Sequence, residues 1–314
     1  MRSTLASAAS ALSLASLAAA QLDKPIIEPE FPDGGLGSLD QGLEDNLAVP
    51  GNTWDLWDAG WIPEDCKTLA EAAEFNPLDI ISFNIQYDDC EDPWVMCRHK
   101  DSEFDEQAIV DTFGKLPVHF RSFVRHMIFV PGDPSAGSAG DNVQMNGELG
   151  ISVFVHETAH SMDGHGFPDI GGFSVSQIWL DAYNNDTAVP DAYAQSSQQE
   201  NFAQQTVVAL YDLVVPDGIG TVQPNYQAIQ NQYTAIKTYG ADLITPGGQC
   251  TSRLENSAPV EIGASAKMRF GAKPDVSLSK NTRVIKPSPM KDTMELREFK
   301  SGKVVEKRVV KLNK

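Results

Sequence analysis

Thiols and long apolar runs are both scarce in this chain of 314 residues. It holds four cysteines and no Cys-x-x-Cys pair, which disfavours a metal site built on cysteine. Beyond residue 20, no apolar stretch approaches the roughly 18 residues that a membrane helix needs. No hydrophobic tail suited to a lipid anchor follows at the C-terminus. We therefore expect a soluble protein that has no membrane as a partner.

Positive charge is scarce as well, and most of it lies near the C-terminus. The net charge is −19, yet residues 261–314 contain 14 Lys and Arg against 6 Asp and Glu. Residues 1–260 contain 10 basic against 37 acidic side chains, which disfavours nucleic acid as a partner. The basic tail fits three descriptions: a solvated extension, a segment lying against the acidic body, or a binder of polyanions such as cell-wall polymers.

The first twenty residues have the composition of a secretory signal peptide. Arg2 provides a short positive region, residues 12–17 lie in an apolar stretch, and three alanines precede a cleavage point before Gln21. We expect a secreted protein, located outside the cell or in the cell wall. Asn185 begins an Asn-Asp-Thr glycosylation sequon, which we expect on a surface loop.

In an oxidising compartment the four cysteines should pair, and three connectivities are possible. We favour Cys90–Cys97, because this bond would close the tip of a hairpin. By elimination, Cys66–Cys250 would then tie the start of the domain to its end.

The middle of the chain contains both strand-like and helix-like segments, and we expect an α+β fold. Residues 21–50 are rich in Pro, Gly and acids and are expected to form an irregular leader. Residues 51–255 should form one domain, and residues 256–314 a basic, disordered tail with some strand tendency near Val304 and Val309. Strands are expected at 78–87, 94–98, 126–130 and 142–146, and a loop at 131–141. Helices are expected at 103–113, 116–124, 150–162, 174–184, 197–214 and 224–244.

One pentapeptide carries most of the functional information. The run His156-Glu157-Thr158-Ala159-His160 is an H-E-x-x-H motif inside an expected helix. On a helix the two imidazoles share one face and can hold a single zinc ion, with the Glu157 carboxylate beside them as a general base. The alternative is that these are ordinary helix residues.

A catalytic zinc ion takes three protein ligands, and three residues compete for the third place. Glu200 is favoured because it opens an apolar-patterned helix, although an acid there can simply stabilise the helix dipole. His165 is one place out of register for the H-E-x-x-H-x-x-G-x-x-H pattern, where Gly166 occupies the histidine position. Asp163, three residues after His160, is better suited to orienting a ligand histidine.

Tyr193, Glu200 and the Asn-Phe-Ala that follows resemble the Tyr-x6-Glu-x-Phe-Ala signature of the lethal-factor-like and Pro-Pro-endopeptidase-like zincins. The resemblance covers about residues 148–214. It implies a zincin-like, gluzincin-type metallopeptidase domain with a small sheet and a central active-site helix. It also implies that Glu200 completes the zinc site and that Tyr193 is the transition-state donor. The chain departs from the signature at Gln204, where relatives usually carry Glu.

The whole chain also resembles fungal secreted proteins of the conidiation-specific type. Two functions from different classes follow. The first is a secreted zinc metalloendopeptidase acting on protein or peptide, with Glu157 as general base for a zinc-activated water. The second is a non-catalytic zinc-binding surface antigen or zinc scavenger on the same scaffold. The intact Glu157 and the lack of a His-rich or Cys-rich tail favour the first.

Overall fold

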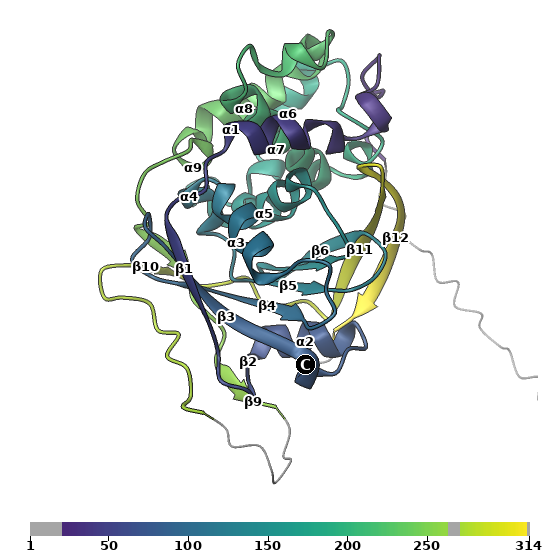
Figure 1. Cartoon of the computed structure of the whole chain (residues 1–314). Coiled ribbons are helices and arrows are strands. Elements are labelled where there is room, and N and C mark those ends of the chain that lie inside the picture. Colours follow the sequence, from purple (N-terminus) through teal and green to yellow (C-terminus); the bar gives the residue numbers. More distant parts are fainter. Residues whose placement is uncertain (1–20, 263–270, 313–314) are drawn as a thin grey trace, which may run out of the picture.

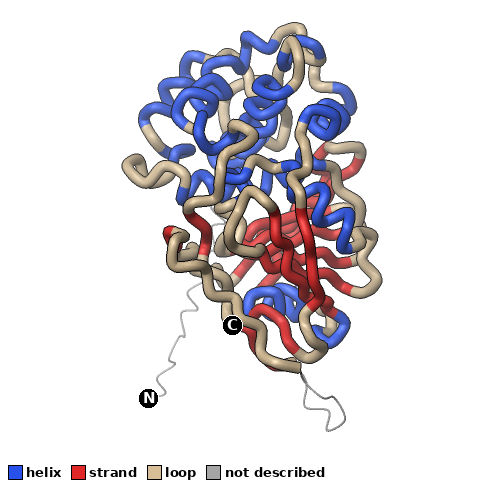
Figure 2. The backbone as a smooth tube through the Cα atoms, turned by 60° about the vertical axis from the view of Figure 1, so that its left-hand side comes forward, coloured by secondary structure: helices blue, strands red, loops and turns tan. Residues whose placement is uncertain are grey.

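An eight-stranded mixed sheet is the central element of the computed structural model, which describes residues 21–262 and 271–312. The strand order is β1-β3-β4-β5-β7-β6-β11-β12. Most helices gather on one side of this sheet, and α2 lies on the other (Figure 1). Figure 2 shows the same division from another direction, with most helices above the strands. The fold is therefore α+β, as expected, but its sheet is larger than the small one expected.

The strands of the described residues are β1 (Asn52–Leu56), β2 (Trp61–Pro63), β3 (Ile80–Tyr87), β4 (Trp94–His99), β5 (His126–Val130), β6 (Ser135–Ala139), β7 (Asn142–Asn146), β8 (Ser252–Leu254), β9 (Pro259–Glu261), β10 (Arg283–Ile285), β11 (Thr293–Lys300) and β12 (Lys303–Lys311). The α-helices there are α1 (Asp40–Asn46), α2 (Glu64–Ala72), α3 (Glu106–Lys115), α4 (Val118–Arg121), α5 (Ile151–His165), α6 (Gln177–Asn185), α7 (Gln198–Val214), α8 (Gln230–Tyr239) and α9 (Ala241–Ile244). Short 3₁₀ helices are η1 (Pro32–Gly34), η2 (Leu36–Leu39), η3 (Pro77–Asp79), η4 (Phe173–Val175), η5 (Ala194–Ser196), η6 (Gly218–Thr221) and η7 (Tyr226–Ile229). Strands β2 and β9 pair antiparallel, and β8 and β10 pair parallel, outside the main sheet.

The sheet separates two hydrophobic cores. In β5, Met127 and Phe129 belong to the large core under the helices, whereas Ile128 and Val130 belong to a smaller core against α2. This period of two is what a strand buried on both faces requires. Among the described residues, no helix has both the length and the apolar character needed to cross a membrane.

The disulfides differ from the expected pairing. Cys66 is bonded to Cys97, and Cys90 to Cys250, so the expected Cys90–Cys97 bond is wrong. The reason is the alternation of side chains: Cys97 on β4 faces the smaller core and α2, whereas Cys90 belongs to the larger core. Two disulfides are consistent with secretion. The expected signal peptide, residues 1–20, lies outside the described residues.

Both flanking segments are part of the fold where they are described. The leader contains α1 and buries Phe31, Leu39 and Leu43 in the large core. The tail contains β9, β10, β11 and β12, so the expected disorder of residues 256–314 is wrong for the described part. The apolar face of β11 consists of Met294 and Leu296, too few residues among charged neighbours to give a clear pattern in the sequence.

Candidate metal centre

Helix α5 carries the H-E-x-x-H motif through the middle of the molecule. Ile151, Phe154 and Ala159 on this helix are buried in the large core. At its start, the backbone N–H of Ser152 donates to Asp40 Oδ1 at 2.7 Å, so a leader residue places its carboxylate at the helix N-terminus. The motif therefore lies on a helix that is fixed at its start and along its core-facing side.

Helix α7 brings Glu200 to the motif. The Ser197 hydroxyl caps this helix by accepting a hydrogen bond from the Glu200 N–H at 3.1 Å. Glu200 consequently lies in the first turn of α7, and its side chain is buried against α5.

The ligand triad, His156, His160 and Glu200, forms a nearly equilateral triangle of donor atoms. The two Nε2 atoms are 3.1 Å apart, and they lie 3.2 Å and 3.3 Å from Glu200 Oε2. A tetrahedral zinc ion with ligand bonds of 2.0–2.1 Å places its ligand atoms about 3.3 Å apart. Glu200 Oε2 is also buried without a hydrogen-bond partner, which is costly unless a cation binds there. The residues therefore fit a zinc ion.

A second layer of side chains orients His156. Its Nδ1 lies 2.9 Å from Gln204 Oε1, and Gln204 Nε2 donates to Asp191 Oδ2. A proton on Nδ1 leaves the lone pair of Nε2 free for a metal. Burial lowers the pKa of His156, which favours its neutral, ligating form, and burial raises the pKa of Asp191 to about 6. Sequence reasoning missed this role of Gln204, although its departure from the resembled signature was the signal.

Glu157 lies beside the triad and is fully buried. It accepts a hydrogen bond from Ser138 Oγ and two from Arg297 Nη1, at 2.9 Å and 3.1 Å. Arg297 Nη2 donates to Glu200 Oε1 at 2.7 Å, which leaves Oε2 toward the histidines. Burial raises the pKa of Glu157, but Arg297 and the two histidines outweigh it, so the net pKa is lowered. Arg297 belongs to the segment expected to be disordered, and no motif marks it.

Tyr193 also lies next to the triad. Its ring centroid is 5.4 Å from that of His156, and its hydroxyl is buried without a hydrogen-bond partner. Burial of an unpaired hydroxyl is unfavourable, so this group has a hydrogen-bonding capacity that the described residues leave unused.

The other predicted residues lie further from the triad. Asp163 accepts hydrogen bonds from the N–H and hydroxyl of Ser174, at 2.7 Å and 2.6 Å, and the described residues include no bond from it to a ligand histidine. His165 Nε2 lies 2.8 Å from Asp141 Oδ2, outside the triad. Asn185 is exposed, but it is the last residue of α6 and not part of a loop as expected.

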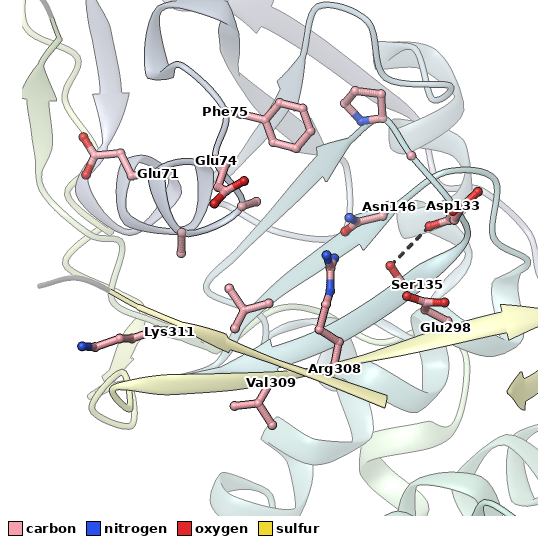
Figure 3. Close-up of a pocket in the computed structure, with 15 residues that line it drawn as sticks. Glu71, Glu74, Phe75, Asp133, Ser135, Asn146, Glu298, Arg308, Val309 and Lys311 are labelled. Atoms are coloured by element: carbon pink, nitrogen blue, oxygen red, sulfur yellow. Dashed lines mark hydrogen bonds between the residues drawn. The ribbon is translucent and has the colours of Figure 1, made fainter. Parts of the chain in front are cut away.

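A cavity of about 480 Å³ opens beside the triad, lined among others by His160, Glu200, Arg297 and Lys291. A larger cavity of about 640 Å³ lies along β12, where Arg308 extends toward Asn146 and Ser135 (Figure 3). The triad does not line this second cavity. We therefore assign the smaller cavity to the metal centre.

Comparison of the sequence with known proteins identifies the family of this chain. The family model described as conidiation-specific protein Con-13 matches residues 33–280. A similar protein, conidiation-specific protein 13 of Neurospora crassa, is 34% identical over 189 residues, which are 58% of this chain and 55% of that protein. The matched part thus spans little more than half of the relative's length. No solved structure matches.

These findings correct one expectation. The family that matches is not that of the lethal-factor-like or Pro-Pro-endopeptidase-like zincins, so the resemblance at Tyr193 and Glu200 was wrong as a guide to kinship. A five-residue motif and a short signature are small samples of sequence, whereas the family match covers most of the chain. The chain belongs to the Con-13 family of conidiation-specific proteins.

Proposed function

We propose that this protein is a secreted, zinc-dependent peptidase in which the ligand triad holds the metal and Glu157 is the general base. The observation that carries the proposal is the triangle of donor atoms, in which Glu200 Oε2 has no other partner. Three protein ligands beside a cavity are typical of catalytic zinc sites, which keep one position open, whereas structural sites use four. The two disulfides support the secreted location.

Zinc bound by the triad would supply an acidified water and a Lewis acid for a peptide carbonyl. Glu157, next to His156 on α5, would accept a proton from the attacking water and return it to the leaving amine. The free Tyr193 hydroxyl would donate a hydrogen bond to the carbonyl oxygen as that oxygen gains negative charge. Gln204 and Asp191 would hold His156 in the tautomer that the metal needs.

The test compares zinc content with cleavage of a mixed peptide library. Because Arg297 occupies both oxygens of Glu157, each protein is assayed with Arg297 and with Arg297→Met. We expect the native chain and Glu157→Ala to bind zinc equally, and cleavage to disappear with Glu157→Ala. Tyr193→Phe should reduce kcat about 100-fold, as loss of an oxyanion donor does. Tyr211→Phe, which changes a buried tyrosine on α7 outside the site, is the matched control and should leave kcat unchanged.

A second function, zinc binding without hydrolysis, is favoured by one observation. The Arg297 guanidinium neutralises Glu157 and occupies the oxygens that a general base would use. Equal zinc content in the native chain and Glu157→Ala, with no cleavage in either Arg297 background, would favour this second function over the peptidase.

A further inference from the structure

The C-terminal hairpin, formed by β11 and β12, reaches the metal centre from beyond the residues matched by the family model. Its turn residues, Ser301 and Gly302, have φ values of 51° and 72°, the left-handed pair that a tight two-residue hairpin turn requires. The two strands pair with each other from Thr293 with Lys311 to Lys300 with Lys303, with one register shift after Glu298. Against β6, the register extends over Arg297 and Glu298. In backbone pairing, the hairpin is thus held together more extensively than it is held to the sheet, and Met294 and Leu296 of β11 add contacts with the smaller core.

One side chain of this hairpin contacts the proposed catalytic machinery. Arg297 is buried, and its guanidinium pairs with Glu157 and Glu200 through 2.7–3.1 Å hydrogen bonds. Its Cζ atom lies 5.4 Å from the ring centroid of Tyr193, and Lys307 Nζ lies 4.8 Å from the same ring. The proposed base, a ligand and the proposed oxyanion donor are therefore all covered by one hairpin.

The place that β11 occupies is suited to a peptide. Strand β6 packs beside α5, and its Ser138 hydroxyl bonds to Glu157. Without β11, this strand would be the edge of the sheet next to the triad, and an exposed edge pairs readily with an extended peptide. The two backbones are close, since a Cβ on Gly137 would lie 2.3 Å from the Glu295 carbonyl oxygen. A peptide and β11 cannot both occupy this edge.

We propose that the C-terminal hairpin is a built-in inhibitory strand, which fills the peptide-binding edge of β6 and closes the metal centre with Arg297. The proposal rests on the peptidase function proposed above. Displacement of the hairpin as a unit would free the oxygens of Glu157 and expose the β6 edge to an extended peptide. The chain as described is then the latent form.

A disulfide lock tests the proposal in the full-length chain. Ser135 and Glu298 are direct register partners across β6 and β11, so Ser135→Cys with Glu298→Cys should fix the hairpin to the sheet. The matched control is Glu298→Cys with Glu306→Cys, which joins register partners within the hairpin and leaves the contact with β6 free.

Two rates are measured on the zinc-loaded proteins: transfer of zinc to excess chelator, and peptide cleavage. We expect the lock to slow both rates at least about tenfold relative to the control, with recovery after mild reduction. Rates equal to those of the control would overturn the proposal.

Substitution of Arg297 tests the same contact from the opposite direction. Arg297→Met should raise peptide cleavage and zinc transfer at least about tenfold, because the hairpin loses its ion pairs to the site. Arg308→Met removes the same charge from the same hairpin at the cavity of Figure 3, and should change neither rate. If Arg297→Met instead lowers zinc affinity and cleavage together, Arg297 is a positioning residue of the site, and the inhibitory role is wrong.

The two proposals fail in different ways. If no form cleaves peptide but the lock slows zinc transfer, the hairpin covers a metal-binding centre and the peptidase function is wrong. If Glu157-dependent cleavage occurs at the same rate in the locked and control proteins, the peptidase function stands and the inhibitory strand is wrong.

Discussion

Gln204 orients a proposed metal ligand without carrying a charge of its own. Its carbonyl oxygen lies 2.9 Å from Nδ1 of His156, and its amide donates to Asp191. The negative charge of Asp191 is thereby separated from the triad by one dipolar group. A carboxylate in direct contact would make the His156 imidazole a stronger ligand. The Gln204 amide therefore fixes the orientation of the ring but increases its basicity less than a carboxylate would.

Replacement of Gln204 should therefore weaken zinc binding without removing a ligand. We expect Gln204→Ala to lower zinc affinity about 10- to 100-fold, the usual effect of losing the partner that orients a ligand histidine. Gln230→Ala, which changes an exposed glutamine at the start of α8, is the control. Competitive titration against a zinc-binding dye measures both, and equal affinities would show that Gln204 does not orient His156.

The buried carboxyl of Asp191 should make the stability of the folded protein depend on pH. Burial raises its pKa from 3.8 to about 6 in the folded protein. Between these values the folded state binds more protons than the unfolded state, so the free energy of unfolding falls as the pH rises from about 4 to about 6. The shift of about 2 units corresponds to a loss of about 3 kcal/mol.

Asp191→Asn should remove that loss. The free energy of unfolding of both metal-free proteins is measured in urea at pH 4 and pH 7. Between these two pH values, the free energy of the variant should rise relative to that of the native chain by up to about 3 kcal/mol. The control Asp169→Asn changes an exposed residue, and its free energy of unfolding should differ from that of the native chain by the same amount at both pH values. A constant difference between Asp191→Asn and the native chain would contradict the raised pKa of the buried Asp191 carboxyl.

The triad could be predicted from the sequence in large part because the geometry of its two histidines is local. Two histidines four residues apart meet on any α-helix, and Glu200 opens the next long apolar-patterned helix. Arg297 could not be predicted, since it is 140 residues from Glu157 and only the tertiary fold brings them together. A lone arginine in a basic segment carries no signature of a buried ion pair.

At the scale of elements, periodic segments were predictable and irregular ones were not. Helix α5 was expected at 150–162 and spans Ile151–His165, and β5 has the bounds expected. Strand β6 was expected to be a loop, because Ser-Ala-Gly-Ser-Ala has no β-branched or aromatic residue. Its strand conformation comes from pairing with β7 and β11 on both sides. Tertiary context therefore decided the conformation of the strand whose Ser138 bonds to Glu157.

The disulfides give a prediction at the same scale. Cys66–Cys97 closes 31 residues of chain and Cys90–Cys250 closes 160. On the loop-entropy model, removing them by paired Cys→Ala substitutions should lower the free energy of unfolding by about 4 and about 5 kcal/mol respectively. Denaturant unfolding of the two double variants shows which disulfide contributes more to the free energy of unfolding. Peptide mapping without reduction would contradict the pairing if it found Cys90 linked to Cys97.

Across the whole molecule, the uneven charge of the sequence becomes contact between its two parts. The basic C-terminal segment returns to the acidic body through Arg297, which pairs with Glu157 and Glu200, and through Lys286, which pairs with Glu255. The exposed Lys286 pair contributes little to stability, whereas breaking the buried pairs would leave uncompensated charge. The composition allowed three descriptions of the basic C-terminal segment. In its described residues, this segment lies against the acidic body.

The metal centre is the claim on which the rest depends, and zinc stoichiometry after equilibrium dialysis tests it most directly. The native chain and Glu157→Ala should each retain about one zinc ion per chain, because Glu157 is not a ligand. Glu200→Ala should retain far less, since it loses the oxygen that completes the triangle with His156 and His160. Zinc retained equally by Glu200→Ala and the native chain, or by neither, would contradict the account.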